Sequence, residues 1–257
     1  MAKRILDIVD MQNDFMMPKG ALYVKDAEKI IPHAKAFLQR IGGSAFDFIL
    51  MKSDTHFAET YSLNPESKQF PMHCRFNTWG WKTAFDLPDG LAIPVYRMNK
   101  NVFDMWAAQP DLGAVSFNDE TNAQAYKNLF NVLSEKDKPQ SRDAFLKDKD
   151  IGKETEVVMM GVASDYCVHD AIAGYLKRGC KVTVLRDMVK GIGTDVEGRA
   201  KSGHIDEVVK LDAFRESVKN GQLRVIESAK LLKEINQEKK NEQNNKNCRR
   251  PTQPNRR

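Results

Sequence analysis

The sequence lacks the long apolar run that a membrane-spanning helix requires. Crossing a bilayer takes roughly 18 to 20 consecutive apolar residues, and no stretch of the 257 residues approaches that length. The opening MAKRILDIVD also introduces Asp7 and Asp10 before a signal-like apolar segment can form. We therefore expect a protein that is neither secreted nor anchored in a membrane.

Cysteine is also scarce, and its spacing excludes two classes of small domain. None of the four cysteines, Cys74, Cys167, Cys180 and Cys248, belongs to a CxxC pair. This argues against a disulfide framework and against a zinc ribbon. Cys180 lies in the apolar segment CKVTVL and is expected to be a small core residue. The pattern favours a cytoplasmic protein, because thiols stay reduced in that compartment.

A positive charge spread over the whole chain is missing too. The formal net charge is +5, but residues 228–257 contain nine Lys or Arg and three Glu, so residues 1–227 carry −1. The stretch 236–257 has no apolar periodicity, and we expect residues 229–257 to form a basic, disordered tail. Such a tail could contact nucleic acid or anionic lipid, but its composition favours a solvated terminus.

What the sequence does contain is an alternation of short apolar segments with helical ones. Strands are expected at 4–10, 46–54, 93–100, 155–162, 180–187 and 222–228, and helices at 26–41, after Cys167, around 195–202 and at 212–220. Strands that are apolar throughout and separated by helices indicate a parallel sheet covered on both faces. We predict one α/β domain over residues 1–228, in which residues 104–150 form an insertion or a lid.

Polar residues follow four of these strands, at Asp10, Asp54, Lys100 and Cys167. Parallel sheets carry their chemistry at the carboxyl ends of the strands. Cys167 also begins a helix, where the backbone N–H groups and the helix dipole are expected to lower the thiol pKa from about 8.5. The turn at 161–163 can direct N–H groups at an oxyanion. A thiol, a carboxylate and an ammonium group suit acyl transfer, although each alone is more often a packed or capping residue.

The segment SDTHFAETYSLNPESKQFPMHC, residues 53–74, combines two imidazoles with carboxylates. Asp54 and His56 are two residues apart, so in an extended chain their side chains lie on one side. Glu66 and His73 follow on a loop. Such a ligand set suits Zn²⁺, Fe²⁺ or Mn²⁺ and leaves positions open for water or substrate. From spacing alone, an ordinary polar loop is an equally good interpretation.

These motifs together resemble a known family. VDMQNDF (9–15), the strand that ends at Lys100 and GVASDYCVHDA (161–171) are similar to the isochorismatase-like cysteine hydrolases. SDTH and NPESKQFPMH resemble the metal-binding stretch of the nicotinamidase/pyrazinamidase branch of that family. The resemblance covers about residues 3–228 and is poor over 104–150.

The resemblance implies a three-layer, doubly wound fold with a six-stranded, mainly parallel sheet between helices. It also implies a catalytic triad in which Cys167 is the nucleophile, Asp10 the general acid and base, and Lys100 the electrostatic partner. A cis peptide bond is implied at Val162–Ala163. The N–H groups of Ala163 and Cys167 would then form the oxyanion hole.

The resemblance further implies one divalent metal ion, for which zinc is favoured over iron and manganese. The implied ligands are Asp54, His56 and His73, with Glu66 as an additional carboxylate. The implied reaction converts nicotinamide to nicotinate and ammonia through a cysteine thioester, a step of NAD salvage.

Aromatic residues near these motifs are candidates for the substrate pocket. Phe15 matches an aromatic residue that stacks on the pyridine ring, with core packing as the alternative. Phe103 stands where relatives often have tyrosine, and Trp106 is expected to line the pocket. Trp79 and Trp81 lie in a loop that departs from the family pattern and could reshape the pocket.

This departure keeps a second enzymatic reading open, a cysteine hydrolase that acts on another small amide or ureido substrate. From another class, the protein could be a non-catalytic binding module with a tail that contacts nucleic acid. The intact set of Asp10, Lys100 and Cys167 argues against the binding module. The sequence does not decide between a monomer and a homo-oligomer.

Overall fold

A single eight-stranded sheet forms the centre of the computed structural model, which describes residues 3–43, 45–113, 115–117, 119–134 and 138–248. Six neighbouring strands run parallel, in the spatial order β3 (Val95–Lys100), β2 (Phe48–Asp54), β1 (Lys3–Val9), β6 (Thr155–Val162), β7 (Lys181–Lys190) and β8 (Leu223–Ile226). Two short antiparallel strands, β4 (Asn131–Leu133) and β5 (Gln140–Ser141), extend the sheet beyond β3. The predicted six parallel strands are confirmed, and the structure adds two at one edge.

The strand order creates a crevice beside β1. The chain builds β1, β2 and β3 outward in one direction and then returns to place β6 on the other side of β1. In the register of the sheet, Ile5 lies between Phe48 of β2 and Val157 of β6. The chain segments that follow two such neighbouring strands leave the sheet toward opposite faces. A crevice therefore opens between the carboxyl ends of β1 and β6. Asp10 and the turn before Cys167 lie at these two ends.

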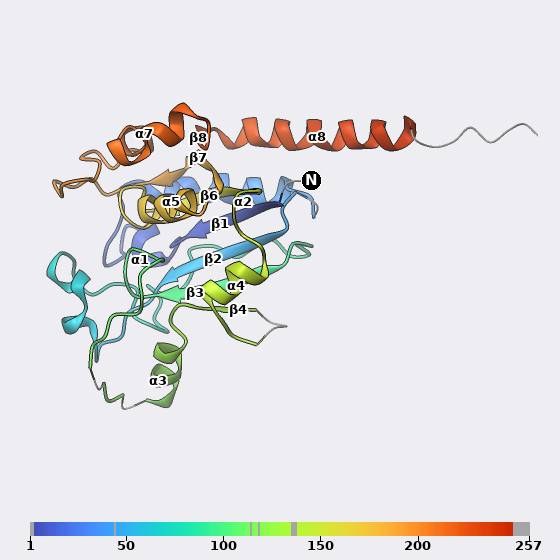
Figure 1. Ribbon diagram of the computed structural model, residues 1–257. Coiled ribbons are helices and arrows are strands. Elements are labelled where there is room, and N and C mark those ends of the chain that lie inside the picture. Colours follow the sequence, from blue (N-terminus) through green and yellow to red (C-terminus); the bar gives the residue numbers. More distant parts are fainter. Residues whose placement is uncertain (1–2, 44, 114, 118, 135–137, 249–257) are drawn as a thin grey trace, which may run out of the picture.

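Helices cover both faces of the sheet, as Figure 1 shows. Helix α5 (Cys167–Lys177) packs against β6 and β7, with α7 (Asp212–Lys219) beside it, whereas η1 (Ala27–Lys29) and α2 (Ile30–Arg40) lie behind the sheet in this view. The two longer of these helices bury apolar stripes, which include Ala34, Phe37 and Leu38 of α2 and Val168, Ala171 and Ile172 of α5. This burial on both faces explains the nearly continuous apolar strands. The predicted three-layer fold is confirmed.

The helix expected around 195–202 is wrong. This segment is a loop between β7 and the short helix α6 (Ile205–Val208). Gly193, Gly198 and Gly203 have φ values of 83°, 79° and 68°, a left-handed conformation that interrupts a helix. Further short helices lie in the loops that follow the strands, namely α1 (Asn13–Met16), η2 (Tyr61–Leu63) and η3 (Pro65–Lys68).

Residues 104–150 continue the edge of the sheet. They contain α3 (Glu120–Lys127), β4, β5 and α4 (Arg142–Asp148). Strand β4 pairs with β3 through Val132 opposite Met98. Phe145 and Leu146 of α4 are buried in the main core. This region is therefore joined to the domain by both backbone pairing and side-chain packing.

The disorder expected for residues 229–257 is wrong for residues 229–248, which form most of helix α8 (Ser228–Cys248). Leu231, Leu232 and Ile235 of its first turns are buried in the main core, and Arg4 forms an ion pair with Glu238 at 3.0 Å. Three apolar residues anchor the helix in spite of its polar composition, and Figure 1 shows it extending beyond the sheet. Residues 249–257 lie outside the described part of the chain.

None of the helices in the described part of the chain combines the length and apolar character that a bilayer-spanning segment needs.

Candidate active site

Three side chains from separate strand ends meet in one buried cluster. Asp10 directly follows β1, Lys100 is the last residue of β3, and Cys167 is the first residue of α5. The Nζ atom of Lys100 lies 2.9 Å from Oδ2 of Asp10 and 3.4 Å from Sγ of Cys167. All three residues are buried. The predicted nucleophile, acid/base and cation are therefore neighbours, with the ammonium group in contact with the other two.

Burial and the neighbouring charges determine the protonation of this cluster. Burial lowers the pKa of Lys100, but Asp10 and Asp54 outweigh it, so that the pKa lies well above its usual value and the ammonium group stays charged. Burial raises the pKa of Cys167 well above its usual value, against the opposing effect of Lys100. The lowering expected at the start of a helix is therefore wrong, because desolvation of the thiolate dominates. A thiol with a raised pKa needs a neighbouring base to become a thiolate.

Asp10 has the properties of such a base. Its Oδ2 atom pairs with Lys100, whereas its Oδ1 atom has no hydrogen-bond partner among the described residues. Its backbone has a φ of 49°, in the left-handed region that L-residues rarely adopt. A buried carboxylate oxygen without a partner is costly in a folded protein and usually marks a functional position.

The turn before Cys167 contains both residues expected for the oxyanion hole. The Val162–Ala163 peptide bond is cis, as the resemblance implies. The Ala163 carbonyl accepts hydrogen bonds from the N–H groups of Tyr166 and Val168, which closes the turn. Cys167 is the first residue of α5, so its own N–H group has no acceptor within the helix. Ala163 and Cys167 thus lie in one tight turn next to the nucleophilic sulfur.

Gly161 allows this turn to approach β1. Its φ is 128°, and a Cβ atom placed on it would lie 2.0 Å from the carbonyl oxygen of Val9. Glycine is therefore required at this position near the end of β6.

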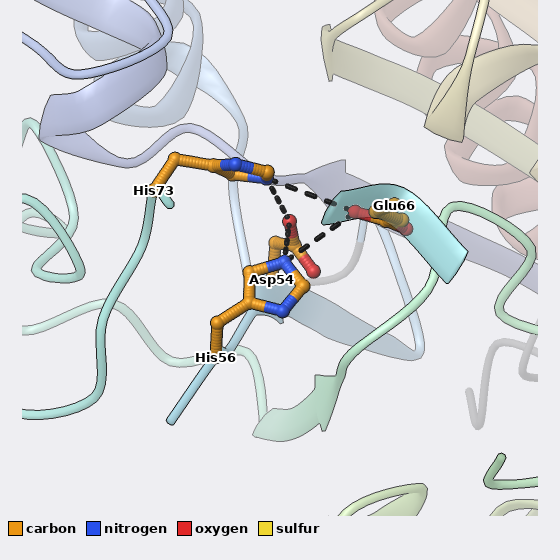
Figure 2. A group of neighbouring side chains, drawn as sticks. All are labelled: Asp54, His56, Glu66 and His73. Carbon is orange, nitrogen blue, oxygen red and sulfur yellow. Dashed lines mark hydrogen bonds and ion pairs between the residues drawn. The ribbon is translucent and has the colours of Figure 1, made fainter. Parts of the chain in front are cut away.

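The four predicted metal ligands also converge, as Figure 2 shows. Oδ2 of Asp54 lies 3.1 Å from Nε2 of His56 and 2.9 Å from Nε2 of His73. Oε2 of Glu66 lies 3.4 Å and 3.7 Å from the same two nitrogens. One ligand atom of each residue lies within 4.8 Å of all the others, and all four residues are buried. The geometry brings together two imidazoles and two carboxylates from β2, η3 and the following loops.

The chemistry of this group fits a divalent cation. Both carboxylate oxygens of Glu66 are buried without a hydrogen-bond partner among the described residues. The Nδ1 atom of His73 donates to the carbonyl oxygen of Pro71 at 2.8 Å, so that in the neutral ring the lone pair of Nε2 faces Asp54. An oriented imidazole and a buried carboxylate without a hydrogen-bond partner are donors that suit Zn²⁺ and similar ions.

The four candidate ligands, which we call the metal group, adjoin the cluster of Asp10, Lys100 and Cys167. Oδ1 of Asp54 lies 3.6 Å from Nζ of Lys100. Burial lowers the pKa of His56, but Asp54 and Glu66 outweigh it and raise this pKa to about 9. Burial, with Asp54, raises the pKa of Glu66. The carboxylate of Asp54 therefore connects the four candidate metal ligands to the ammonium group of Lys100.

Two of the predicted pocket aromatics lie beside this centre. The ring of Phe15 is 5.3 Å from the ring of His73. The ring of Phe103 is 5.0 Å from that of Tyr166, the residue before Cys167, and 5.7 Å from that of Phe70. Phe15 thus borders the metal group, and Phe103 borders the nucleophile turn.

Trp106 lies elsewhere. Its indole N–H donates to the carbonyl oxygen of Asp170 at 3.1 Å, and the Arg178 guanidinium lies 3.8 Å from the centre of its ring. Its ring also contacts Tyr175 at 4.9 Å, so it packs along the side of α5. A cation–π pair and the close approach to Gly174 hold the indole against the helix, and its position in the substrate pocket stays a prediction.

Sequence reasoning missed Gln12. Its side chain is buried, with Oε1 accepting from the Asp54 N–H at 2.7 Å and Nε2 donating to the Asp54 carbonyl at 2.8 Å. Nε2 also donates to the carbonyl of Trp81 at 2.8 Å, which connects the loop that contains Trp79 and Trp81 to Asp54. The signal available in the sequence was that Gln12 follows two residues after Asp10, the acidic residue at the end of a buried strand.

Comparisons with known proteins agree with this geometry. No family model matches the chain. The nicotinamidase of Saccharomyces cerevisiae is 25% identical over 218 residues, which cover 76% of this chain and 91% of the relative. The nicotinamidase of Escherichia coli is 25% identical over 216 residues, which cover 78% and 89%. The crystal structure of the pyrazinamidase of Pyrococcus horikoshii in complex with zinc matches with a TM-score of 0.55 and 24% identity, over 88% of this chain and 99% of that chain.

The chain is therefore similar in fold to solved pyrazinamidases and isochorismatase-like cysteine hydrolases, and in sequence to two nicotinamidases. The resemblance to the nicotinamidase/pyrazinamidase branch that the sequence motifs predict is confirmed.

Proposed function

We propose that the protein is an amidohydrolase that converts nicotinamide to nicotinate and ammonia. The observation that carries this proposal is the contact of Lys100 with both Asp10 and Cys167, beside a buried group of metal-binding side chains. The similarity to two nicotinamidases supports the choice of substrate.

The reaction proceeds in two halves. Asp10 takes the proton from Cys167, and the thiolate sulfur forms a bond to the carboxamide carbon. The resulting oxyanion accepts hydrogen bonds from the N–H groups of Ala163 and Cys167. Asp10 then gives its proton to the departing amine, so that ammonia leaves and a thioester remains. A water molecule, deprotonated by Asp10, hydrolyses the thioester to nicotinate and restores the thiol.

Lys100 has an electrostatic role throughout. Its ammonium group lies next to the carboxylate and the sulfur, so it stabilises whichever of them carries the negative charge. Because Lys100 is buried, this attraction is stronger than it would be in water.

We further propose that Asp54, His56, Glu66 and His73 hold one divalent ion, with zinc favoured over iron and manganese. When bound, the ion supplies Lewis-acid character toward the pyridine nitrogen of the substrate. Phe15 stacks on the pyridine ring, and Phe103 borders the reacting carboxamide. We place the reaction in the cytoplasm, as a step of NAD salvage, and this location is supported by the buried, unpaired Cys74, Cys167 and Cys180.

The direct test measures ammonia release by the full chain loaded with zinc. Nicotinamide is compared with benzamide, which carries the same carboxamide on a ring without nitrogen, and with a panel of small amides and ureido compounds. We expect kcat/KM for nicotinamide to exceed that for benzamide by about a hundredfold or more.

Two outcomes would contradict different parts of the proposal. Cleavage of another amide or ureido compound without nicotinamide turnover would contradict nicotinamide as the substrate but not the assignment as a hydrolase. If no member of the panel releases ammonia, the assignment as an amidohydrolase is contradicted.

A further inference from the structure

A second hydrophobic core lies behind the metal group, separate from the main core. It is formed by Phe57, Leu129 and Phe130, with five partly buried residues packed around them, and we call these eight residues the α3 cluster: Phe57, Phe76, Val102, Phe117, Ala125, Tyr126, Leu129 and Phe130. Five of them, from Phe117 to Phe130, come from the region 104–150, which matches the family motifs poorly. The other three come from the loops that follow β2 and β3.

The α3 cluster contacts the metal group through Phe57, the residue that follows the ligand His56. The ring of Phe57 lies 5.7 Å from that of Phe117 and 5.6 Å from that of Tyr126, both edge-on. Phe57 is 1% exposed, so its ring has no room to move without displacing these neighbours. Helix α3 supplies Tyr126, and Figure 1 shows this helix at the edge of the fold beyond β4.

A second connection reaches His56 through the backbone. The His56 N–H donates to the carbonyl of Cys74 at 3.0 Å, and the Phe76 N–H donates to the carbonyl of His56 at 2.8 Å. The ring of Phe76 lies 5.5 Å from that of Phe57, within the same cluster. His56 is therefore followed in the chain by Phe57 and hydrogen-bonded to Phe76, and the rings of both phenylalanines belong to the α3 cluster.

The cluster also reaches the strand that ends at the catalytic lysine. The Phe130 N–H donates to the carbonyl of Asn99 at 2.7 Å, next to Lys100 in the sequence. Val102 packs into the cluster two residues beyond Lys100. One group of side chains from residues 104–150 thus contacts both loops that carry parts of the candidate site.

We propose that residues 104–150 position the metal site from behind and that Tyr126 and Phe117 are positioning residues for His56. This inference rests on the proposed metal-dependent function. Groups that orient a metal ligand from outside its coordination sphere typically change metal affinity by about 10- to 100-fold when they are removed. Loss of a ring from the α3 cluster leaves a cavity into which Phe57 can shift, which moves the backbone of His56.

The test compares two half-buried tyrosines that both join residues 104–150 to the sheet. Tyr126 has ring contacts with Phe57 and Phe117, whereas Tyr96 has ring contacts with Phe48 and Phe145, near the start of β3. Metal-stripped full-length protein is titrated with zinc against a chromophoric chelator. We expect Tyr126→Leu to weaken zinc binding by about tenfold, Tyr96→Leu to stay within about twofold of wild type, and Tyr126→Phe to retain wild-type affinity.

Thermal unfolding of the metal-free variants shows whether each variant folds. If Tyr126→Leu does not fold, Phe117→Leu takes its place, with the same expected loss of affinity. Wild-type zinc affinity in the folded Tyr126 or Phe117 variant, or an equal loss in Tyr96→Leu, would overturn this inference alone. A wild-type protein that binds no zinc would overturn the metal proposal and this inference with it.

Discussion

The ammonium group of Lys100 lies 2.9 Å from the carboxylate of Asp10, and both side chains are almost completely buried. A charge pair in such a place is costly to desolvate, so its burial is weak evidence for stability. The sulfur of Cys167 lies 3.4 Å from the same nitrogen, which suits the catalytic role proposed for this pair. The predictions below separate the contributions of these residues to stability from their contributions to catalysis.

Replacing Lys100 by methionine should damage both properties. Lys100→Met leaves the buried carboxylates of Asp10 and Asp54 without their cation, and we expect the free energy of unfolding to fall by about 3–5 kcal/mol. We expect kcat for nicotinamide to fall by about a hundredfold or more. Urea unfolding and ammonia release measure the two effects.

The Lys52–Asp7 pair provides the control, since it is equally buried with a separation of 2.8 Å. Lys52→Met should lose a similar amount of stability and keep kcat within about tenfold of wild type. A Lys100→Met variant that folds and retains kcat would contradict the electrostatic role of Lys100.

The two buried cysteines Cys167 and Cys180 should differ sharply in their effect on activity. Cys167→Ala removes the nucleophile, and we expect ammonia release to fall by about a thousandfold or more. Cys180→Ala removes a core sulfur at the start of β7 and should leave kcat unchanged. Zinc content measured on both variants should equal that of wild type. Substantial turnover by Cys167→Ala would rule out the thioester route.

Zinc binding should weaken in acid because protons compete for His56. The neighbouring carboxylates raise the pKa of His56 to about 9 without a metal, whereas a ligand imidazole must be neutral. The apparent affinity should therefore fall as the pH drops from 9 to 7, by up to about tenfold per pH unit for one displaced proton. Calorimetry in buffers of different ionisation enthalpy should detect the release of about one proton at pH 7.

The same shift has the opposite consequence for the metal-free protein. A raised pKa in the folded state means that protonated His56 contributes stability below its ordinary pKa of 6.5, and that this contribution is lost as the pH rises through about 9. Zinc affinity that does not change between pH 7 and 9 would contradict the raised pKa of His56.

Gln12 should prove important for the metal site although it is no ligand. Gln12→Leu leaves the N–H and carbonyl groups of Asp54 without partners, which costs about 1–3 kcal/mol for each buried group. Zinc affinity should fall by about tenfold or more. Gln222 also bridges two backbone carbonyls, those of Leu176 and Cys180, far from the site in the sequence. Gln222→Leu should reduce stability but leave zinc affinity as in wild type.

Deleting residues 239–257 should leave catalysis intact. The buried anchors Leu231, Leu232 and Ile235 remain, as does Glu238, which pairs with Arg4. The full chain and the truncated chain should release ammonia at the same rate and differ in unfolding free energy by less than about 1 kcal/mol. Salt-dependent binding of single-stranded RNA by the full chain alone would instead support a nucleic-acid role for the basic end.

Local pattern was enough to predict most of the sheet. The six parallel strands appear in the sequence as short apolar runs because both of their faces are buried. Strands β4 and β5 were missed since each is only a few residues long and depends on pairing with the edge of β3. Helix α8 was missed because its buried apolar residues are confined to its first turns and the rest of the segment is polar, although these residues are sufficient to anchor it.

The sequence by itself determined which residues are candidates for the chemistry, because side-chain type and position after a strand are local properties. Asp10, Lys100, Cys167 and the four candidate metal ligands could all be named from motifs. Only the tertiary structure decided how these groups affect one another. The pKa of Cys167 is raised rather than lowered, because burial is a property of the packed interior and not of the chain. The same holds for Gln12, Trp106 and the α3 cluster, whose contacts join segments that the sequence keeps far apart.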